Sequence, residues 1–443
     1  MKINIIGGGL AGSEAAWQLL KRGHTVELFE MRPIRGTDAH KTGNLAELVC
    51  SNSLKSLSEN TGPGELKREM KLLNSLVIEA GEFARVPAGQ ALAVDREKFS
   101  AFIESRLKQF DGFTRTDQEV TELPTSNQLE SSNEIWLVAT GPLTSTSLSQ
   151  SLVELCDTDT RLYFYDAIAP ILSADTIDMD ECFFADRYGK GDSDYINLPL
   201  SKEGYEHFID SVIAAEKMPL HAFESTSYFE SCLPIEVMIE RGRETLRFGP
   251  MKPVGLVDPK TDKRPWANVQ LRKENKDGTM YSMVGFQTKM KWPAQKEVFS
   301  QLPGLKNVEI LRYGSVHRNT YIESPKVLNN DLSFRSNPRI FLAGQITGVE
   351  GYTESAAMGL LAALAIDAKA QNRPVVMPPS DTMMGGLYTY ITAGCLGKFA
   401  PMNANLGLLP SLKRSKKISK AEKKQVQCTL AYEKFSQWNE VLV

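Results

Sequence analysis

Two cysteines stand where neighbouring side chains could make a thiol reactive. Cys50 lies in the polar stretch LAELVCSNSLKS, among serines and an asparagine. Cys232 lies in YFESCLPIEVMIERGRETLRFGPMKPVGL, between aromatic residues and a segment rich in arginine and lysine. Cations near a thiol lower its pKa and increase the fraction of thiolate, which is the nucleophilic form. An unpaired cysteine is more often a small buried apolar residue, so these surroundings alone leave both interpretations open.

The six cysteines show no pattern of a disulfide framework or of a metal site. They are scattered along the chain, without a C-x-x-C pair and without histidines at zinc spacing. We therefore expect no metal, and reduced thiols in a cytoplasmic protein.

A glycine-rich turn near the N-terminus has the spacing that binds the pyrophosphate of a dinucleotide. The stretch KINIIGGGLAGSEAAWQLLKRGHTVELFEMR predicts a strand, a turn, a helix and a second strand, which form a βαβ unit. Its G-x-G-x-x-G glycines permit the tight turn, the approach of the backbone to phosphate and close helix packing. The acid at the end of the second strand can accept hydrogen bonds from the ribose hydroxyls. The predicted contacts are Gly7, Gly8, Gly9, Leu10, Ala11, Gly12, Glu30, Met31 and Arg32.

Two later segments favour FAD over a nicotinamide dinucleotide as the resident cofactor. EIWLVATGPL resembles the second flavoprotein signature, and PRIFLAGQITGVEGYTESAAMGLLAALAI resembles the third, with a glutamine where many flavoproteins have an aspartate. The amides that open the following helix are expected to face the flavin. An ordinary second strand and helix is the alternative interpretation. The predicted contacts are Thr140, Gly141, Gly344, Gln345, Glu354 and Ser355.

Cofactor segments at both ends of the chain predict a discontinuous domain. We expect an α/β, Rossmann-type FAD-binding domain, glutathione-reductase-like, built from residues 1–150 and 331–443, with an inserted α+β domain at 151–330. The inserted region has short aromatic strands and one helix near KEGYEHFIDSVIAAEK. Elsewhere we expect a helix over DREKFSAFIESRLKQF, a surface turn at PTSNQLESSN and a helix start at residues 51–53.

Composition limits the class of protein. The 443 residues are 42% apolar with a formal net charge of -3, which suits a soluble protein of two or three domains and argues against a uniformly basic nucleic-acid binder. We expect no membrane segment, because no apolar run approaches the length of a bilayer. A local basic patch remains compatible with RNA, and LKRSKKISKAEKK near the C-terminus is either such a patch or a solvated helix face.

Several long blocks occur in a fixed order along the chain: AHKTGNLAELVCSNSLKS, VPAGQALAVDREKF, CLPIEVM, TLRFGPMKPVGL, VGFQTKMKWPAQ and PMNANLGLLP. Together they resemble the TrmFO family, the bacterial folate- and FAD-dependent tRNA (uracil-5-)-methyltransferases. The resemblance runs from residue 2 to about residue 415. Cys50 and Cys232 are retained, whereas Leu198 stands in YINLPL where the family pattern has a cysteine.

The resemblance implies methylation of C5 of the T-loop uridine in tRNA. Methylenetetrahydrofolate would donate the carbon, and FAD reduced by NADPH or NADH would carry the methylene group and supply reducing equivalents. Uracil C5 is a poor nucleophile, so a thiolate must add at C6 and a base must remove the C5 proton. Cys232 is the predicted nucleophile and Cys50 the predicted proton acceptor or supporting thiol, although the two roles are interchangeable on these grounds.

The resemblance also suggests neighbours for these reacting groups. Near the folate or the flavin we expect His317, His40 and Lys41. The target base must leave its stack to reach the flavin, and cations must follow the RNA phosphates. The candidate phosphate contacts are Arg241, Arg243, Arg247, Lys252, Lys413 and Arg414.

Other functions compatible with the sequence share parts of this chemistry. A relative could methylate ribosomal RNA instead. The larger wobble-uridine modifying flavoprotein MnmG, also called GidA, shares the glycine-loop and helix sequence, but its chain has an extra helical C-terminal region, and length and the CLPIEV block disfavour it. A plain NAD(P)H-dependent flavin oxidoreductase and a non-enzymatic RNA-binding flavoprotein both predict no one-carbon transfer.

Overall fold

The computed structural model describes residues 1–37, 39–132, 134–156, 161–189, 193–218, 233–275, 277–393, 399–410 and 419–442. For residues 161–168, 315–319 and 420 only the backbone is described.

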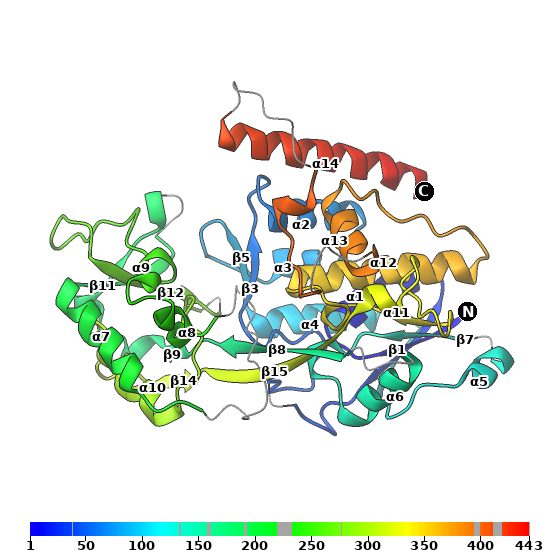
Figure 1. Ribbon diagram of the computed structural model, residues 1–443, viewed down its shortest axis with the longest axis horizontal. Helices are drawn as coiled ribbons and strands as arrows, with labels where there is room; N and C mark the ends of the chain where they lie inside the picture. Colours follow the sequence, from blue (N-terminus) through cyan, green and yellow to red (C-terminus); the bar gives the residue numbers. More distant parts are fainter. Residues whose placement is uncertain are drawn as a thin grey trace.

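A five-stranded parallel sheet forms the first layer of the described residues. Its strand order is β16-β7-β1-β2-β6, so that strands from both ends of the chain lie side by side (Figure 1). The apolar run of β1 explains its central place, because Ile3 and Ile5 are fully buried. The strands are β1 (Lys2–Ile6), β2 (Thr25–Glu30), β6 (Phe113–Asp117), β7 (Glu134–Val138) and β16 (Ile340–Leu342).

Two helices pack closely beside this sheet. They are α1 (Leu10–Lys21) and α12 (Tyr352–Ala370), and a Cβ added at Gly359 would lie 2.2 Å from the backbone oxygen of Ala11. Glycine at this crossing therefore allows the two backbones to approach. The parallel sheet with its covering helices confirms the predicted Rossmann-type α/β fold.

A second group of elements lies between β2 and β6 in the chain. A three-stranded antiparallel sheet, β3-β5-β4, is accompanied by three helices. The predicted helix after Asp95 is present as α4, and the Asp95 carboxylate accepts from the Lys98 amide at 3.1 Å. The elements are β3 (Ser53–Ser56), α2 (Gly62–Leu72), α3 (Leu76–Phe83), β4 (Arg85–Val86), β5 (Ala91–Val94) and α4 (Arg96–Leu107).

A six-stranded antiparallel sheet with its own apolar core forms the other layer, called the second sheet below (Figure 1). Its order is β10-β11-β12-β13-β9-β14. Leu198 is fully buried in β11, where an apolar side chain contributes to packing. The strands are β9 (Ile171–Ser173), β10 (Phe183–Phe184), β11 (Tyr195–Leu200), β12 (Ala267–Lys273), β13 (Met280–Met283) and β14 (Ile310–Arg312).

Helices and a long two-stranded ribbon accompany the second sheet. The ribbon pairs β8 (Arg161–Ile168) with β15 (Ser315–Ile322) in antiparallel register and runs between the two layers in Figure 1. The predicted helix near residue 202 is present as α7. The helices are α7 (Lys202–Ala214), α8 (Ile235–Glu240), α9 (Thr245–Phe248) and α10 (Trp292–Phe299).

Two local predictions were wrong. The turn expected at PTSNQLESSN contains helix α5 (Ser126–Ser131), because Thr125 and Gln128 form a capping box. The helix start expected at residues 51–53 is instead the entry to strand β3, since the Asn52 side chain bonds to distant carbonyls rather than to a helix N-terminus.

The C-terminal basic run falls largely outside the described residues, which resume at residue 419. Helix α14 (Lys420–Leu442) then packs on α2, and the Arg68 guanidinium lies 3.9 Å from the centre of the Tyr432 ring (Figure 1). None of the helices in the described ranges has the length and apolar character needed to cross a membrane.

Candidate active site

The glycine turn after β1 forms the floor of a cavity. Gly7 has φ +103°, and a Cβ there would lie 2.6 Å from the Ala139 carbonyl oxygen. A Cβ at Gly12 would lie 1.9 Å from the Gly7 carbonyl oxygen, whereas one at Gly9 would meet no atom within 4 Å. Only glycine therefore fits at Gly7 and Gly12, while the Gly9 backbone at the start of α1 faces open space that a phosphate can enter.

The cavity above this turn, called the nucleotide cavity below, has a volume of about 580 Å³. Its wall combines the first and second cofactor segments. The lining residues include Gly7, Gly9, Glu30, Met31, His40 and Thr140. Leu10 and Ala11 are buried in the first turn of α1, where Ala11 packs against Gly344.

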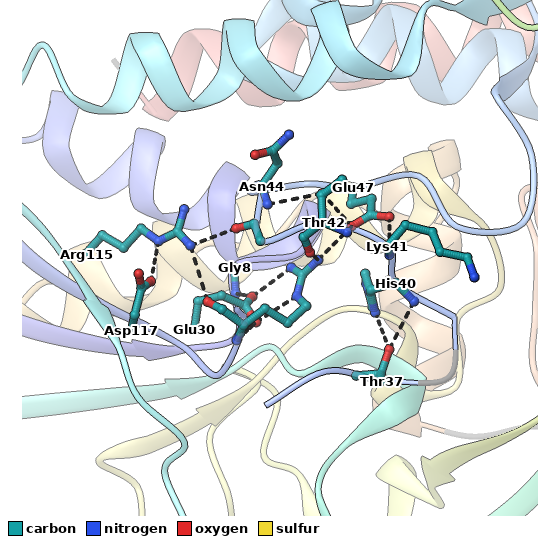
Figure 2. Close-up of polar contacts among 12 residues, drawn as sticks. Gly8, Glu30, Thr37, His40, Lys41, Thr42, Asn44, Glu47, Arg115 and Asp117 are labelled. Carbon is teal, nitrogen blue, oxygen red and sulfur yellow. Dashed lines mark hydrogen bonds and ion pairs between the residues drawn. The ribbon is translucent and has the colours of Figure 1, made fainter. Parts of the chain in front are cut away.

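Glu30 is the central charged group of this wall. Its carboxylate accepts from the Gly8 amide at 2.9 Å (Figure 2). It also accepts from the Arg32 side chain at 2.9 Å. Burial alone would raise the Glu30 pKa, yet the hydrogen bonds and charge of Arg32 hold that pKa below its usual range. Glu30 is therefore an ionised carboxylate that fixes the glycine turn and borders the cavity.

These features fit a dinucleotide such as FAD. The glycines and the helix N-terminus leave room for its pyrophosphate, and the ionised acid in the cavity wall suits its ribose. Of the contacts predicted for the first segment, Gly7, Gly9, Glu30, Met31 and Arg32 line the cavity; their contact with FAD stays a prediction.

His40 borders the same cavity on the side of the loop that leads to Cys50. Its Nδ1 lies 2.7 Å from the Thr37 hydroxyl (Figure 2). Burial and the Arg32 charge lower the His40 pKa to about 4, so the imidazole is neutral at pH 7. The adjacent Lys41 amide donates to Glu47 at 2.8 Å, and the Lys41 side chain borders a different cavity.

The third cofactor segment is tied to its surroundings by polar contacts. The Gln345 amide donates to Glu350 at 3.0 Å. Glu354 is fully buried and accepts from Lys55 Nζ at 2.7 Å; burial opposes ionisation, but Lys55 holds the Glu354 pKa below its usual range. The Ser355 amide donates to the Gly351 carbonyl within the helix, so the structure does not leave that amide for the flavin. Gly344 and Gly141 both have positive φ.

Cys50 contacts the first residue of the same helix. The Tyr352 hydroxyl oxygen lies 2.8 Å from the Cys50 amide nitrogen, 3.2 Å from the Ser51 amide nitrogen and 2.9 Å from Cys50 Sγ. Two amide donors occupy both lone pairs of that oxygen, so the hydroxyl hydrogen is left for the sulfur. Burial raises the Tyr352 pKa well above its usual range, and the charge of Cys50 adds to this shift. The hydroxyl therefore stays protonated and can act as a donor.

Two arginines contribute positive charge near Cys50. Arg96 Nε bonds Glu274 at 2.9 Å, and its Nη1 donates to the Leu48 carbonyl two residues before Cys50. Despite burial, Glu274 raises the Arg96 pKa, with smaller contributions from Tyr352 and Cys50. Burial and the Arg96 charge lower the pKa of the second arginine, Arg312, while Tyr352 and Cys50 oppose that shift. These charges favour the thiolate form of Cys50.

Asn52 connects the Cys50 loop to the second sheet. Its Nδ2 donates to the Val94 and Lys273 carbonyls at 3.0 and 2.9 Å, and its Oδ1 accepts from Arg272 at 2.9 Å. Asn52 is fully buried. The loop that carries the thiol is therefore fixed to β12 as well as to α12.

A cavity of about 1050 Å³, called the junction cavity below, opens where the Cys50 loop, α4 and the second sheet meet. Charged side chains from all three line it. They include Lys41, Glu47, Arg96, Lys98, Glu274 and Arg312. A small polar ligand can therefore approach the Cys50 loop between the two layers.

Other predicted residues are placed less completely. Cys232, Lys413 and Arg414 lie outside the described residues, as does the side chain of His317. Arg243 pairs with Glu206 and Asp210 at 2.9 and 2.8 Å, and Arg247 stacks 3.7 Å from the Trp266 ring centre, so neither guanidinium points freely to solvent. Arg241 and Lys252 are exposed, with Phe248 81% exposed between them.

Two other described cysteines, Cys182 and Cys428, are buried. Burial raises the pKa of Cys182 to about 12 and that of Cys428 to about 11, so both are neutral thiols at pH 7. Among the described residues, no group of three or more histidine, cysteine, aspartate or glutamate side chains is placed to hold a metal ion.

The sequence predictions missed Tyr352, Arg96 and Arg312, although Tyr352 opens the helix of the third cofactor segment. Its position directly after Gly351 was the available signal. No local sequence pattern indicates that the two arginines lie near Cys50, because their position depends on contacts between segments far apart in the chain.

Comparison with known proteins identifies relatives over the whole chain. The family model described as Glucose inhibited division protein A matches residues 2–374. Proteins described as methylenetetrahydrofolate--tRNA-(uracil-5-)-methyltransferase TrmFO from Staphylococcus aureus strains JH9 and Newman are 50% identical over 441 residues, 99% of each chain.

Two solved structures share the fold. Aquifex aeolicus GidA superimposes with a TM-score of 0.70 in one crystal form and 0.68 in another, at 15% identity. Each superposition covers 100% of this chain, and 74% or 77% of the GidA chain. The chain therefore belongs to the glucose inhibited division protein A family and, within it, to the TrmFO proteins.

Proposed function

We propose that this protein is an FAD-dependent enzyme that methylates C5 of the T-loop uridine in tRNA, with methylenetetrahydrofolate as carbon donor and NADPH or NADH as reductant. The observation that carries the proposal is the position of Cys50: a thiol bonded to Tyr352, the first residue of the flavin-side helix, in a chain 50% identical to TrmFO over its length. A thiol in this position suits chemistry between a base and a flavin.

The chemistry requires two protein groups at the pyrimidine ring. A thiolate adds at C6 and makes C5 nucleophilic; after the one-carbon unit is attached, a base removes the C5 proton and the thiolate leaves. Cys232 is our nucleophile and Cys50 our proton acceptor, with the exchanged assignment as the alternative. Bound FAD supplies the two reducing equivalents that convert the transferred methylene unit into a methyl group, so one reduced nicotinamide is oxidised per methyl group.

The described residues perform the binding and positioning steps. The glycine turn and Glu30 hold the dinucleotide, and Tyr352 fixes Cys50 and donates to its sulfur. Phe248, with Arg241 and Lys252, offers an exposed aromatic ring and cations beside the segment that follows Cys232, which suits an unstacked RNA loop. We place the reaction in the cytoplasm, where free thiols persist.

The test measures methyl transfer and adduct formation in parallel. Purified protein with FAD, methylenetetrahydrofolate and NADPH is given unmodified tRNA, and 5-methyluridine at the T-loop position is quantified by mass spectrometry. A T-loop RNA with 5-fluorouridine should accumulate a covalent protein adduct, because fluorine cannot leave as a proton does. Cys232→Ala should abolish the adduct, whereas Cys50→Ala should retain it but lose turnover.

Each alternative gives a different result. Methylation of ribosomal RNA but not of tRNA would change the substrate and keep the chemistry. Oxidation of NADPH without any methylated RNA would leave only a flavin oxidoreductase, and an adduct retained in Cys232→Ala but lost in Cys50→Ala would exchange the two roles.

A further inference from the structure

Arg312, the last residue of β14, is a partly buried cation without a partner. Within the ranges that the structure describes, its guanidinium makes no hydrogen bond and no ion pair. The neighbouring Arg96 is different, because it is bonded to Glu274 and to the Leu48 carbonyl. A guanidinium carries five N–H donors, and leaving these donors without hydrogen bonds in a partly buried site costs free energy. Arg312 is therefore prepared for an oxygen that a ligand supplies.

The position of Arg312 determines where that ligand oxygen would lie. Its side chain lines the junction cavity together with Leu48 and Arg96, which bond to each other two residues before Cys50. The Cys50 sulfur itself bonds the Tyr352 hydroxyl, so Arg312 faces a cavity beside the loop that carries this pair. A base that reaches Cys50 thus passes within the reach of Arg312.

The chemistry of uracil identifies the atom that needs this cation. When a thiolate bonds to C6, the electron pair of the C5–C6 double bond moves towards C4, and the C4 carbonyl oxygen, O4, becomes an enolate oxygen. No oxidant or co-reactant takes part in this addition, and the negative charge of the thiolate passes to O4. Because C4 is bonded to C5, O4 lies beside the atom whose proton Cys50 would accept. If Cys50 instead attacks C6, O4 is still attached to the same six-membered ring, at C4, two ring atoms away from the atom that is attacked.

We propose that Arg312 binds O4 of the target uracil and stabilises the enolate oxygen that forms when the thiolate adds to C6. This inference rests on the proposed function. A donor aimed at an oxygen whose charge grows during the reaction stabilises the transition state more than the ground state. Arg312 then acts on the rate of addition rather than on the affinity for RNA.

The charge of the cavity favours a base over a phosphate at this position. Glu47, Asp95, Glu97 and Asp277 line the same cavity as Arg312. Together with Glu274 these carboxylates number five, against the four cations Lys41, Arg96, Lys98 and Arg312 in the same lining, so the cavity offers no net positive charge to RNA phosphates and does not repel a neutral uracil ring. The bound base therefore brings an uncharged oxygen that gains charge only during catalysis.

Hydrogen exchange at C5 tests the addition step without folate. A T-loop RNA carrying [5-³H]uridine is incubated with the FAD-loaded protein, and tritium released to water is counted. Arg312→Gln should lower the exchange rate about 100-fold, and Arg312→Lys, which keeps the charge, should lower it less. Lys108→Gln, which removes a 62% exposed cation directly after α4 and outside the cavity, should exchange at the wild-type rate.

Two further measurements separate this role from a structural one. The RNA dissociation constant, the flavin absorbance and the thermal unfolding midpoint of Arg312→Gln should stay at wild-type values. With 4-thiouridine as target, sulfur replaces O4 and accepts hydrogen bonds poorly, so the deficit of Arg312→Gln relative to wild type should shrink to less than about 10-fold.

The inference is overturned by unchanged exchange in Arg312→Gln, by a weakened RNA affinity with a smaller salt dependence, which indicates a phosphate contact, or by a raised KM for the folate alone, which indicates a folate contact. An equal deficit on uridine and 4-thiouridine would also overturn it. If wild-type protein neither exchanges C5 hydrogen nor methylates RNA, the proposed function has failed instead.

Discussion

Replacing Tyr352 with phenylalanine removes the hydroxyl that links Cys50 to α12. The hydroxyl accepts from two amides and is left with its own hydrogen for Cys50 Sγ at 2.9 Å. A hydrogen bond to a charged acceptor is worth about 1.5–3 kcal/mol, and about 1.4 kcal/mol corresponds to one pH unit. Because this bond favours the thiolate, Tyr352→Phe should raise the pH midpoint of Cys50 alkylation by about one to two units.

The assay follows iodoacetamide labelling of the Cys50 peptide by mass spectrometry between pH 5 and pH 10, with about equal protein and flavin content in each sample. Tyr205→Phe is the matched control, because it removes a buried hydroxyl that donates to the Arg243 carbonyl in the other layer. An alkylation midpoint that stays constant or falls in Tyr352→Phe would show that the sulfur, not the hydroxyl, is the donor and would refute the argument.

Three other perturbations address the framework of the site. Gly12→Ala places a Cβ 1.9 Å from the Gly7 carbonyl and should release FAD and destabilise the fold by at least about 2 kcal/mol, as measured by flavin fluorescence and urea unfolding; Gly36→Ala, with nothing within 4 Å, should do neither. Asn52→Ala leaves Arg272 and two carbonyls without their buried partner and should lower the free energy of unfolding by about 3 kcal/mol, whereas the exposed Asn307→Ala should change it little. Burial raises the pKa of Glu65 from 4.5 to about 7, so folding favours its protonated form. The contribution of Glu65 to stability should be greatest below about pH 4.5 and fall by up to about 3 kcal/mol as pH rises to 7. The difference in unfolding free energy between wild type and Glu65→Gln, from urea titrations, should change by that amount over this range, whereas the difference for Glu59→Gln, at a 69% exposed carboxylate, should stay constant.

The cofactor framework could be predicted because its signals are local. Gly7, Gly12 and Glu30 lie within one strand-turn-helix-strand unit, and the steric limits on those glycines are the limits that the motif encodes. The helix capped by Asp95 was predicted for the same reason. A short local pattern determines the local structure when the residues that satisfy its hydrogen bonds are close in the chain.

The surroundings of Cys50 could not be predicted, since they come from remote segments. Tyr352 is 302 residues away, and Arg272 is 220 residues from Asn52. The same long-range bonds explain the wrong helix start at residues 51–53, because an asparagine that resembles a helix cap is used across the layers. Sequence pattern identified the thiol, and tertiary structure determines its partners.

These partners make the reactivity of Cys50 depend on both layers at once. Tyr352 fixes the thiol to α12, while Asn52 fixes the same loop to β12 through Arg272. The bond from Arg96 to Glu274, just past the end of β12, adds a second connection between these parts. A displacement of β12 relative to α4 must therefore break buried bonds or carry the Cys50 loop with it. In the function proposed above a base enters between these layers, so its docking and the geometry of the thiol would be linked by the same few contacts.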